Sequence, residues 1–331
     1  MNRGGCSSSR GRSTASGCPS DRWKIEIPEG SSSPPPSFGR KPCSEEDSSS
    51  ACDSDGLGNC SDRDNMKPFD IFLEKKGTPF TLKPPLLAQN RERRNAVKKS
   101  TVGHNGVVLR SGMVLLKNFL SMDDQVVILK TCRQLGLDEG GFYQPGYRDG
   151  ANLRLKMMCL GKNWDPETCQ YGDTRPVDGA KPPKIPLQFN RFVERAIKES
   201  QTLIARNSKR ANGEDGIPSM SADLCIVNFY TSTGQLGLHQ DKDESEESLQ
   251  KGLPVVSFSI GDSAEFLYGD QRDVDRADKV VLDSGDVLLF GGKARKVFHG
   301  VKSILPNTAP KTLLQLTDLR PGRLNLTFRQ Y

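Results

Sequence analysis

The sequence predicts a mainly β fold with flanking helices (α+β), whose core is a double-stranded β-helix, or jelly roll. Short apolar segments recur at regular spacing through residues 221–331, separated by turns that contain Gly, Asp or Pro. About eight such segments in so short a stretch are typical of a double-sheet jelly roll rather than a parallel α/β sheet. Two amphipathic segments precede them, and we expect these to be helices that pack on the outside of one sheet.

The first 65 residues differ in composition from the rest of the chain. Residues 1–65 contain 16 serines and the run SSSPPPS, and they hold too few aliphatic side chains to offset the entropy lost on folding. We therefore expect a disordered Ser/Gly/Pro-rich tail at 1–65. Residues 66–220 should hold an N-terminal extension with the helices and a long loop, and 221–331 the jelly-roll core, with 66–331 as one folded unit.

Charge and hydropathy restrict the possible partners. The tail has 8 Lys+Arg and 10 Asp+Glu, a net charge of −2. The remainder has 39 Lys+Arg and 31 Asp+Glu, a net charge of +8. A basic folded part favours a polyanionic partner. The sequence contains no run of 18 apolar residues and no apolar segment in its first twenty, so we expect neither a membrane span nor a secretory signal. We also expect a monomer.

Cysteine usage and the basic segments bear on location. The nine cysteines show no C-x-x-C spacing in the tail and are scattered elsewhere, which favours reduced thiols in a nuclear and/or cytoplasmic protein. A Ser- and Arg-rich start leaves organelle targeting open. The cluster NRERRNAVKKS at 90–100 is either a phosphate contact, a nuclear address or a solvated loop.

Before residue 220 the expected elements are strands, two helices and a loop. Residues 106–120 predict strands, and SMDDQVVILKTCRQLG then predicts a helix with Ser121 as N-cap and Gly136 as its stop. A second helix is expected over 187–204, with Pro186 at its start and four apolar residues on one face: Phe189, Phe192, Val193 and Ile197. The Gly-, Pro- and Asp-rich stretch between the helices (161–184) predicts a long irregular loop of the kind that often forms a lid or binding loop.

After residue 220 each expected strand is a short apolar run bounded by turn residues. These runs are DLCIVNFY, LPVVSFSI, AEFLYG, DKVVLD, GDVLLFGG, KVFHGV, KTLLQLTDL and RLNLTFRQY.

Three residues form a candidate metal site. His239 and Asp241 in HQDKDES are spaced i, i+2, which in extended chain places both side chains on one face. His299 ends another expected strand in VFHGV. A jelly roll can bring distant strand ends together, giving the two-histidine, one-carboxylate arrangement of non-haem Fe(II) oxygenases. A lone H-x-D also occurs by chance in a solvated charge run, so the pattern requires further support.

The last expected strand, RLNLTFRQY, supplies candidate anion-binding residues. It alternates strictly, with Arg323, Asn325, Thr327 and Arg329 on one face. An exposed edge strand would show the same pattern. Two arginines on one face, however, repel each other unless an anion or a cleft compensates them, and Arg binds carboxylates in bidentate geometry. The other face of the strand is apolar: Leu324, Leu326 and Phe328.

The strand DLCIVNFY shows a similar feature. Asn228 and Tyr230 share one face with Leu224 and Ile226, and an amide and a phenol on an otherwise apolar face indicate hydrogen bonds to a small molecule. A structural role for the tyrosine is the alternative.

Three segments in this order, NFYTSTGQLGLHQDKDE, GDVLLFGGKARKVFHG and RLNLTFRQ, resemble the AlkB family of Fe(II)- and 2-oxoglutarate-dependent dioxygenases. The resemblance covers about residues 105–331. It implies that His239, Asp241 and His299 bind Fe(II), that Arg323 pairs with the distal carboxylate of 2-oxoglutarate, and that O2 is the second cosubstrate. It further implies that Asn228, Tyr230, Asn325 and Arg329 belong to the cosubstrate pocket.

The long loop would then be a nucleotide-recognition lid. Trp164 and Tyr171 in this loop either pack it onto the barrel or stack on a flipped or single-stranded base, and the resemblance favours stacking. Asp243 matches a position that contacts the base, and Arg272 matches a cationic substrate contact. Phe290 stands where bacterial family members commonly carry Trp, a departure that puts base specificity in doubt.

The expected activity is oxidative demethylation of N-methylated nucleobases in DNA, releasing formaldehyde, succinate and CO2. N6-methyladenine, 1-methyladenine and 3-methylcytosine are the candidate bases, and similarity of NWDPETCQY to the first eukaryotic AlkB homologue favours methyladenine. RNA or tRNA is the nearest alternative substrate. A protein hydroxylase or demethylase, a catalytically silent nucleic-acid-binding jelly roll and a metal enzyme that does not use 2-oxoglutarate are further alternatives.

Overall fold

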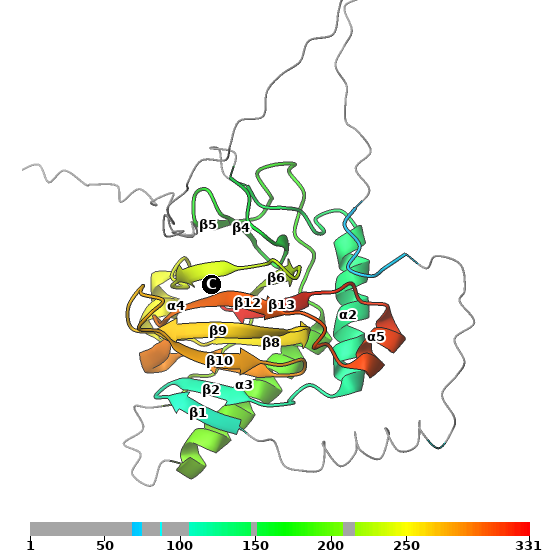
Figure 1. The fold of residues 1–331 in the computed structure, drawn as a ribbon. Coiled ribbons are helices and arrows are strands. Elements are labelled where there is room, and N and C mark those ends of the chain that lie inside the picture. Colours follow the sequence, from blue (N-terminus) through cyan, green and yellow to red (C-terminus); the bar gives the residue numbers. More distant parts are fainter. Residues whose placement is uncertain (1–67, 75–86, 88–105, 147–150, 208–215) are drawn as a thin grey trace, which may run out of the picture. The chain divides into compact units, whose positions relative to one another are not determined.

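The core of the computed structural model consists of a seven-stranded and a four-stranded antiparallel sheet (Figure 1). The structure describes residues 68–74, 87, 106–146, 151–207 and 216–331. The larger sheet has the order β1 (Gly106–Arg110), β2 (Met113–Leu116), β11 (Val287–Phe290), β8 (Val255–Gly261), β13 (Arg323–Arg329), β6 (Leu224–Tyr230) and β3 (Lys156–Leu160). The smaller has the order β10 (Asp278–Leu282), β9 (Ser263–Gly269), β12 (Phe298–Leu305) and β7 (Leu236–His239). The predicted jelly-roll core with flanking helices is confirmed.

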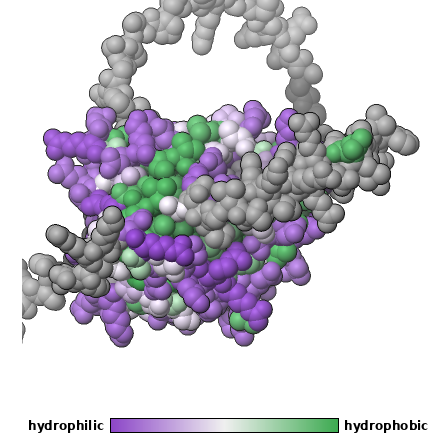
Figure 2. Space-filling view, turned by 90° about the horizontal axis from the view of Figure 1, so that it is seen from below, coloured by the Kyte–Doolittle hydropathy of each residue, from purple (hydrophilic) through white to green (hydrophobic). Residues whose placement is uncertain are grey.

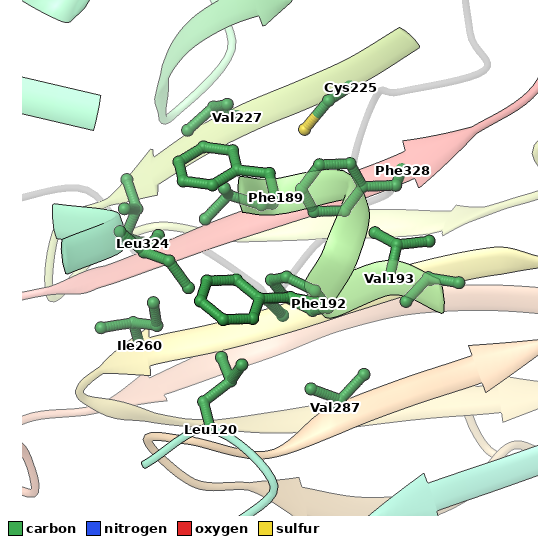
Figure 3. Packing of buried hydrophobic residues seen from close by; sticks show 14 of the residues in the cluster. Leu120, Phe189, Phe192, Val193, Cys225, Val227, Ile260, Val287, Leu324 and Phe328 are labelled. Carbon is green, nitrogen blue, oxygen red and sulfur yellow. The ribbon is translucent and has the colours of Figure 1, made fainter. Parts of the chain in front are cut away.

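Two apolar layers result from the alternation along the strands. One lies between the two sheets and includes Ile226, Phe266 and Phe290. The other lies between the larger sheet and the helices, where Phe189 and Phe192 of α3 (Leu187–Asn207) face the sheet (Figure 3). Burying each such side chain contributes roughly 1.5–3 kcal/mol. The second layer therefore holds α3 against the sheet, which leaves the opposite face of β6 and β13 for the space between the sheets.

The first helix is confirmed, but its predicted stop is wrong. In α2 (Met122–Leu137), the Ser121 hydroxyl accepts a hydrogen bond from the Asp124 amide, and the Asp124 carboxylate accepts one from the Ser121 amide. The C-cap is Asp138, and Gly136 lies buried inside the last turn. A Cβ at Gly136 would lie 2.4 Å from the Phe142 ring, so this glycine allows a close contact rather than ending the helix.

The second helix is confirmed and extends to Asn207, with its predicted apolar face buried. The stretch 161–184 is not wholly irregular, because β4 (Asn163–Asp165) and β5 (Gln170–Gly172) form a hairpin in which Trp164 pairs with Tyr171. Local bonds explain it: the Asp165 carboxylate accepts from the amide of Glu167 and the hydroxyl of Thr168. These bonds close the turn between the two strands.

The segment KTLLQLTDL is a helix, α5 (Lys311–Thr317), and the prediction of a strand is wrong. Leu313 and Thr317, spaced by one helical turn, are both buried, and α5 packs beside α2 (Figure 1). Asp318 takes a left-handed conformation that ends the helix. A run of leucines and threonines satisfies both the strand and the helix pattern, and here packing against α2 decides between them.

Several expectations fall on residues that the structure does not describe. The predicted disordered tail (1–65) and the basic cluster (90–100) lie outside the described residues. The division between residues 220 and 221 stays a prediction, and three strands that precede it, β1, β2 and β3, lie in the same sheet as four that follow it. A short helix, α4 (Glu246–Gln250), and a 3-10 turn, η2 (Gly292–Ala294), complete the elements used below.

The surface shown in Figure 2 carries an area of hydrophobic residues within a largely hydrophilic face. Among the exposed apolar side chains of the described part are Val107 on β1 and Val281 on β10, the edge strands of the two sheets. No helix among the described residues has the length and apolar character to cross a membrane.

Candidate active site

A cavity lined by both sheets holds most of the predicted functional residues. Strands β3, β6, β8, β11 and β13 line it from the larger sheet, and β7, β9 and β12 line it from the smaller one. The hairpin β4–β5 adds Trp164 and Tyr171 to the lining. The fold therefore brings together residues that are far apart in the sequence.

The three predicted metal residues lie together in this cavity. His239 ends β7 and pairs in register with His299 on β12, and their ring centroids are 4.3 Å apart. Asp241 follows two residues later, with Oδ1 3.6 Å from His239 Nε2 and Oδ2 3.7 Å from His299 Nε2. One ligand atom of each lies within 4.8 Å of the others. These separations suit a single ion with bonds of about 2 Å.

Hydrogen bonds and burial prepare the two imidazoles for a metal. His239 Nδ1 lies 2.8 Å from the Gly237 carbonyl, and His299 Nδ1 lies 3.1 Å from the Val297 carbonyl. An Nδ1–H that donates to each carbonyl leaves both Nε2 lone pairs available. Burial lowers the pKa of His239 to about 3, assisted by His299, and burial also lowers the pKa of His299. Both rings are therefore neutral near pH 7, the form that binds metals.

Arg329 orients the Asp241 carboxylate. Arg329 donates from Nε (3.0 Å) and Nη2 (2.7 Å) to Oδ2 of Asp241. Burial alone would raise the pKa of Asp241, but Arg329, with His299 and His239, lowers it below its ordinary value. The residue is thus an anion whose Oδ2 accepts from Arg329 and whose Oδ1 does not. Arg329 lies at the opposite end of β13 from Arg323, about 20 Å away along the strand. Its expected role in the cosubstrate pocket stays a prediction.

Arg323 has no such acidic partner in the described structure. Its Nη2 donates to Ser259 Oγ at 2.9 Å, whereas its Nε and Nη1 are buried and have no hydrogen-bond partner among the described residues. Burial lowers the pKa of Arg323 to about 10, although Tyr230 and Asp286 act in the opposite direction. A buried cation with unused donors is costly unless an anion reaches it. The side chain therefore suits a bound carboxylate.

Asn228 and Tyr230 line the cavity near Arg323. Asn228 Nδ2 lies 3.5 Å from the Tyr230 hydroxyl, and its Oδ1 has no hydrogen-bond partner among the described residues. The Tyr230 ring centroid is 5.7 Å from Arg323 Cζ. The predicted shared face of β6 is thus observed, and Asn228 presents an unused acceptor on the strand that pairs with the strand of Arg323.

Asn325 also faces the cavity, but its amide is already satisfied. Its Nδ2 donates to Ser257 Oγ and to the Phe258 carbonyl, both at 2.8 Å. Its Oδ1 accepts from Thr327 Oγ1 at 3.1 Å. These bonds join β13 to β8, so the structure shows Asn325 cross-linking strands, and its predicted contact with the cosubstrate stays a prediction.

Three of the four predicted substrate residues line the cavity. The Trp164 indole is buried and donates from Nε1 to Asp243 Oδ2 at 3.0 Å, and Tyr171 lies at the same wall. Arg272 is exposed in the turn between β9 and β10 and does not line the cavity. The structure thus brings Trp164, Tyr171 and Asp243 to the metal residues but not Arg272, and all four substrate roles stay predictions.

Glu244, Arg295 and strand β3 were not identified from the sequence as parts of this site. Glu244 and Arg295 form a buried ion pair (2.8 Å) behind Asp241. Their sequence context, a charge run and a Lys/Arg-rich turn, is typical of solvated surface, although Arg295 stands only four residues before His299. Strand β3, which contributes Met157 to the apolar wall, was not predicted. On the other side Phe290 packs against His299, with ring centroids 4.7 Å apart.

Comparisons with known proteins agree with this geometry. Residues 112–329 match the 2OG-Fe(II) oxygenase superfamily. The DNA N(6)-methyladenine demethylase ALKBH1C of Arabidopsis thaliana is 68% identical over 286 residues, 86% of this chain and 62% of the relative. The solved structure of OsALKBH1 is 62% identical with a TM-score of 0.66, over 68% of this chain and 100% of that one. The chain belongs to the AlkB family.

A more distant family member, the tRNA demethylase abh1 of Schizosaccharomyces pombe, is 28% identical over 260 residues, 66% of this chain and 78% of the relative. The chain spans about three-fifths of the length of the curated Arabidopsis relatives that it matches. The superfamily match and the solved structure establish the family, and what the names of the relatives say about substrates is taken up below as a proposal.

Membership of the AlkB family implies Fe(II) as the metal, with 2-oxoglutarate and O2 as cosubstrates. The residues present fit these groups. Two neutral imidazoles and an ionised carboxylate are a suitable donor set for Fe(II). The unused buried donors of Arg323 suit a carboxylate of 2-oxoglutarate.

Proposed function

We propose that this chain oxidatively demethylates N-methylated bases in DNA, with N6-methyladenine as the first candidate and 1-methyladenine and 3-methylcytosine next. The N-methyl base, 2-oxoglutarate and O2 would yield the demethylated base, formaldehyde, succinate and CO2. One observation carries this proposal: a single cavity holds the His–Asp–His cluster, a buried arginine with unused donors among the described residues and an aromatic wall. The names of the Arabidopsis relatives support the choice of base.

Each group has a role that follows from its contacts. His239, Asp241 and His299 hold Fe(II), which when bound supplies the chemistry that activates O2. Arg323 binds one carboxylate of 2-oxoglutarate, and the unused Oδ1 of Asn228 lies on the neighbouring strand. Trp164, held by Asp243, offers a face for stacking a base. The buried walls exclude water from the reacting atoms.

The buried position of the metal residues restricts which form of nucleic acid can be a substrate. A methyl group inside a duplex cannot reach a buried metal, so we propose a flipped or single-stranded base as the partner. The basic charge of residues 66–331 would favour approach of the phosphate backbone.

We also propose that the chain is a monomer and that it is located in the nucleus and/or cytoplasm. Light scattering would test the oligomeric state, and fluorescence imaging of the tagged chain would test the location.

The test is an anaerobic reconstitution with Fe(II), followed by addition of 2-oxoglutarate and O2. The substrates are matched single-stranded DNA and RNA oligomers that carry N6-methyladenine, 1-methyladenine or 3-methylcytosine, analysed by mass spectrometry. Loss of one CH2 unit from DNA, absent with His239→Ala, would support the proposal. Succinate formation without a mass change in any oligomer would overturn the nucleic-acid substrate and direct the search to proteins. Absence of both products with metal bound would overturn the enzymatic proposal.

RNA is the second candidate, because the relative from Schizosaccharomyces pombe is named a tRNA demethylase. The same experiment separates the two, since a faster mass change in the RNA oligomers would favour RNA.

A further inference from the structure

A buried network of charges connects the hairpin β4–β5 to the candidate metal carboxylate. Its acids, Asp241 and Glu244, have side chains that are 6% and 1% exposed, and its bases, Arg295 and Arg329, are 4% and 8% exposed. Two positive charges thus balance two negative charges in one enclosed space. Because buried charges are tolerated only when they are paired and hydrogen-bonded, each member depends on the others for its position.

Arg295 holds the segment that carries Asp241 at two points. Its Nη1 donates to the main-chain carbonyl of Asp241, and its Nη2 donates to Glu244 Oε2 at 2.8 Å. One guanidinium thereby fixes both the backbone of the candidate metal residue and a side chain three residues later. Arg295 also caps η2 four residues before His299, so it joins the Asp241 segment to the His299 segment.

Glu244 and Tyr171 connect this pair to Arg329. Glu244 Oε1 lies 3.3 Å from Arg329 Nε and accepts a hydrogen bond from the Tyr171 hydroxyl at 3.3 Å. Arg329 Nη1 in turn donates to the Tyr171 hydroxyl at 3.2 Å. The phenol of β5 therefore contacts the guanidinium that binds Asp241 Oδ2.

We propose that Glu244, Arg295 and the Tyr171 hydroxyl are positioning residues for Asp241. They fix Arg329 on Oδ2 and the backbone at residue 241, so that Oδ1 faces the metal. This gives the hairpin a second role besides lining the cavity, because Tyr171 ties it to the metal residue. The inference rests on the proposed metal role of Asp241 and is independent of which base is the substrate.

A purely electrostatic role and a positioning role of Arg295 predict opposite changes in cation affinity when the residue is replaced by Gln. The substitution therefore distinguishes the two roles. Arg295→Gln makes the site more negative, so Coulomb attraction alone would strengthen cation binding. Loss of positioning would weaken it, and outer partners of metal ligands typically contribute about 10–100-fold in affinity. Arg295→Lys keeps the charge but loses the two-point contact, so we expect weaker binding from both variants.

The experiment is an anaerobic titration of the full 331-residue chain with Co(II), followed by the ligand-field absorption of the bound ion. We expect the Kd for Co(II) to rise about 10–100-fold in Arg295→Gln, Arg295→Lys and Glu244→Gln. Tyr171→Phe removes only one hydroxyl and should raise it about 3- to 10-fold. The visible spectrum should change in all four, because the carboxylate is held differently. Matched controls are Glu247→Gln and Arg276→Lys, whose parent side chains are 77% and 73% exposed.

A thermal melt of each variant separates positioning from general stability. If Arg295→Lys and Tyr171→Phe bind Co(II) with the affinity and the spectrum of the wild type, the inference is overturned. This holds even if their Tm values differ from that of the wild type. If the Arg295 variants do not fold, Tyr171→Phe decides alone, because it deletes no charge and creates no large cavity. Failure of the wild-type chain to bind Co(II) would instead reject the metal role of Asp241, which is a separate result.

Discussion

The two ends of β13 present the same side chain in different surroundings. Arg323 and Arg329 share one face of one strand, and both are buried. Arg329 meets two carboxylates, Asp241 and Glu244, whereas Arg323 meets a neutral hydroxyl and retains two unused donors among the described residues. The sequence pattern treats the two arginines alike. The structure separates them into a cation with two carboxylate partners and a cation with two unused donors among the described residues.

This difference shows how a buried cation can be assigned a role. A cation that the protein has already paired contributes to the folded state, and removing it leaves its partners without compensation. A cation that the protein leaves partly unsatisfied reduces the stability of the ligand-free state and recovers it on binding. The two arginines should therefore respond differently to the same substitution.

The largest expected effect is on the stability of the metal-free protein. Arg329→Met leaves Asp241 buried without its main counter-ion and should lower the free energy of unfolding by about 3–5 kcal/mol. Arg323→Met removes a poorly compensated charge and should leave that free energy unchanged or raise it. Urea denaturation in the presence of a chelator measures both free energies of unfolding. Equal losses in the two variants would contradict the proposed difference between Arg323 and Arg329.

The next effect concerns 2-oxoglutarate binding. Arg323→Gln should weaken it on the order of 100-fold, because a buried charge pair is lost, and Arg323→Lys should lie between this variant and the wild type. Calorimetry on the anaerobic Mn(II)-loaded protein provides the affinities, with Arg276→Gln as an exposed control. Unchanged affinity in Arg323→Gln would place the carboxylate elsewhere.

The pH dependence of stability tests the metal end. Because burial holds the pKa of His239 at about 3 in the folded state, the unfolded chain binds a proton near pH 6.5 that the folded chain excludes. The contribution of neutral His239 to the free energy of unfolding is therefore complete above pH 6.5 and is lost as the pH falls toward 3. Between pH 8 and pH 5 the metal-free wild type should lose about 2 kcal/mol more than His239→Gln. Parallel pH profiles for the two proteins would show that His239 is not held neutral.

The smallest effect should come from the middle of β13. Thr327→Val removes the hydroxyl that donates to Asn325 Oδ1 and should lower the free energy of unfolding by about 1 kcal/mol. Because the Asn325 amide is used between strands, 2-oxoglutarate affinity should change less than about twofold. A larger loss of affinity would indicate that Asn325 acts on the cosubstrate itself.

The sequence predicted strand faces and candidate site residues where these depend on a pattern of period two or on a short motif. The faces of β6 and β13 follow from alternation, and the H-x-D spacing with the later histidine gave a candidate metal site that the resemblance to the AlkB family then supported. The register that pairs His239 with His299 depends on which strands become neighbours, and no local pattern contains that information. The resemblance implied only that the two histidines share one metal.

The errors have equally specific causes. Residues 311–319 satisfy two periodicities, and packing against α2 selects the helix. Gly136 resembles a helix stop but provides space for Phe142. Glu244 and Arg295 look like solvated charges because the sequence does not show that each is buried against the other. The hydrogen-bond partners of Asn325 and Arg329 could not be predicted from alternation, because they lie on other strands and segments.

The most direct test of the account is a crystal structure of the protein with Mn(II) and 2-oxoglutarate, prepared without O2. We predict that one carboxylate of 2-oxoglutarate lies within hydrogen-bond distance of Nε and Nη1 of Arg323, while Arg329 keeps its two bonds to Asp241 Oδ2. A carboxylate bound to Arg329 instead, with Asp241 released from it, would contradict the division between the two ends of β13.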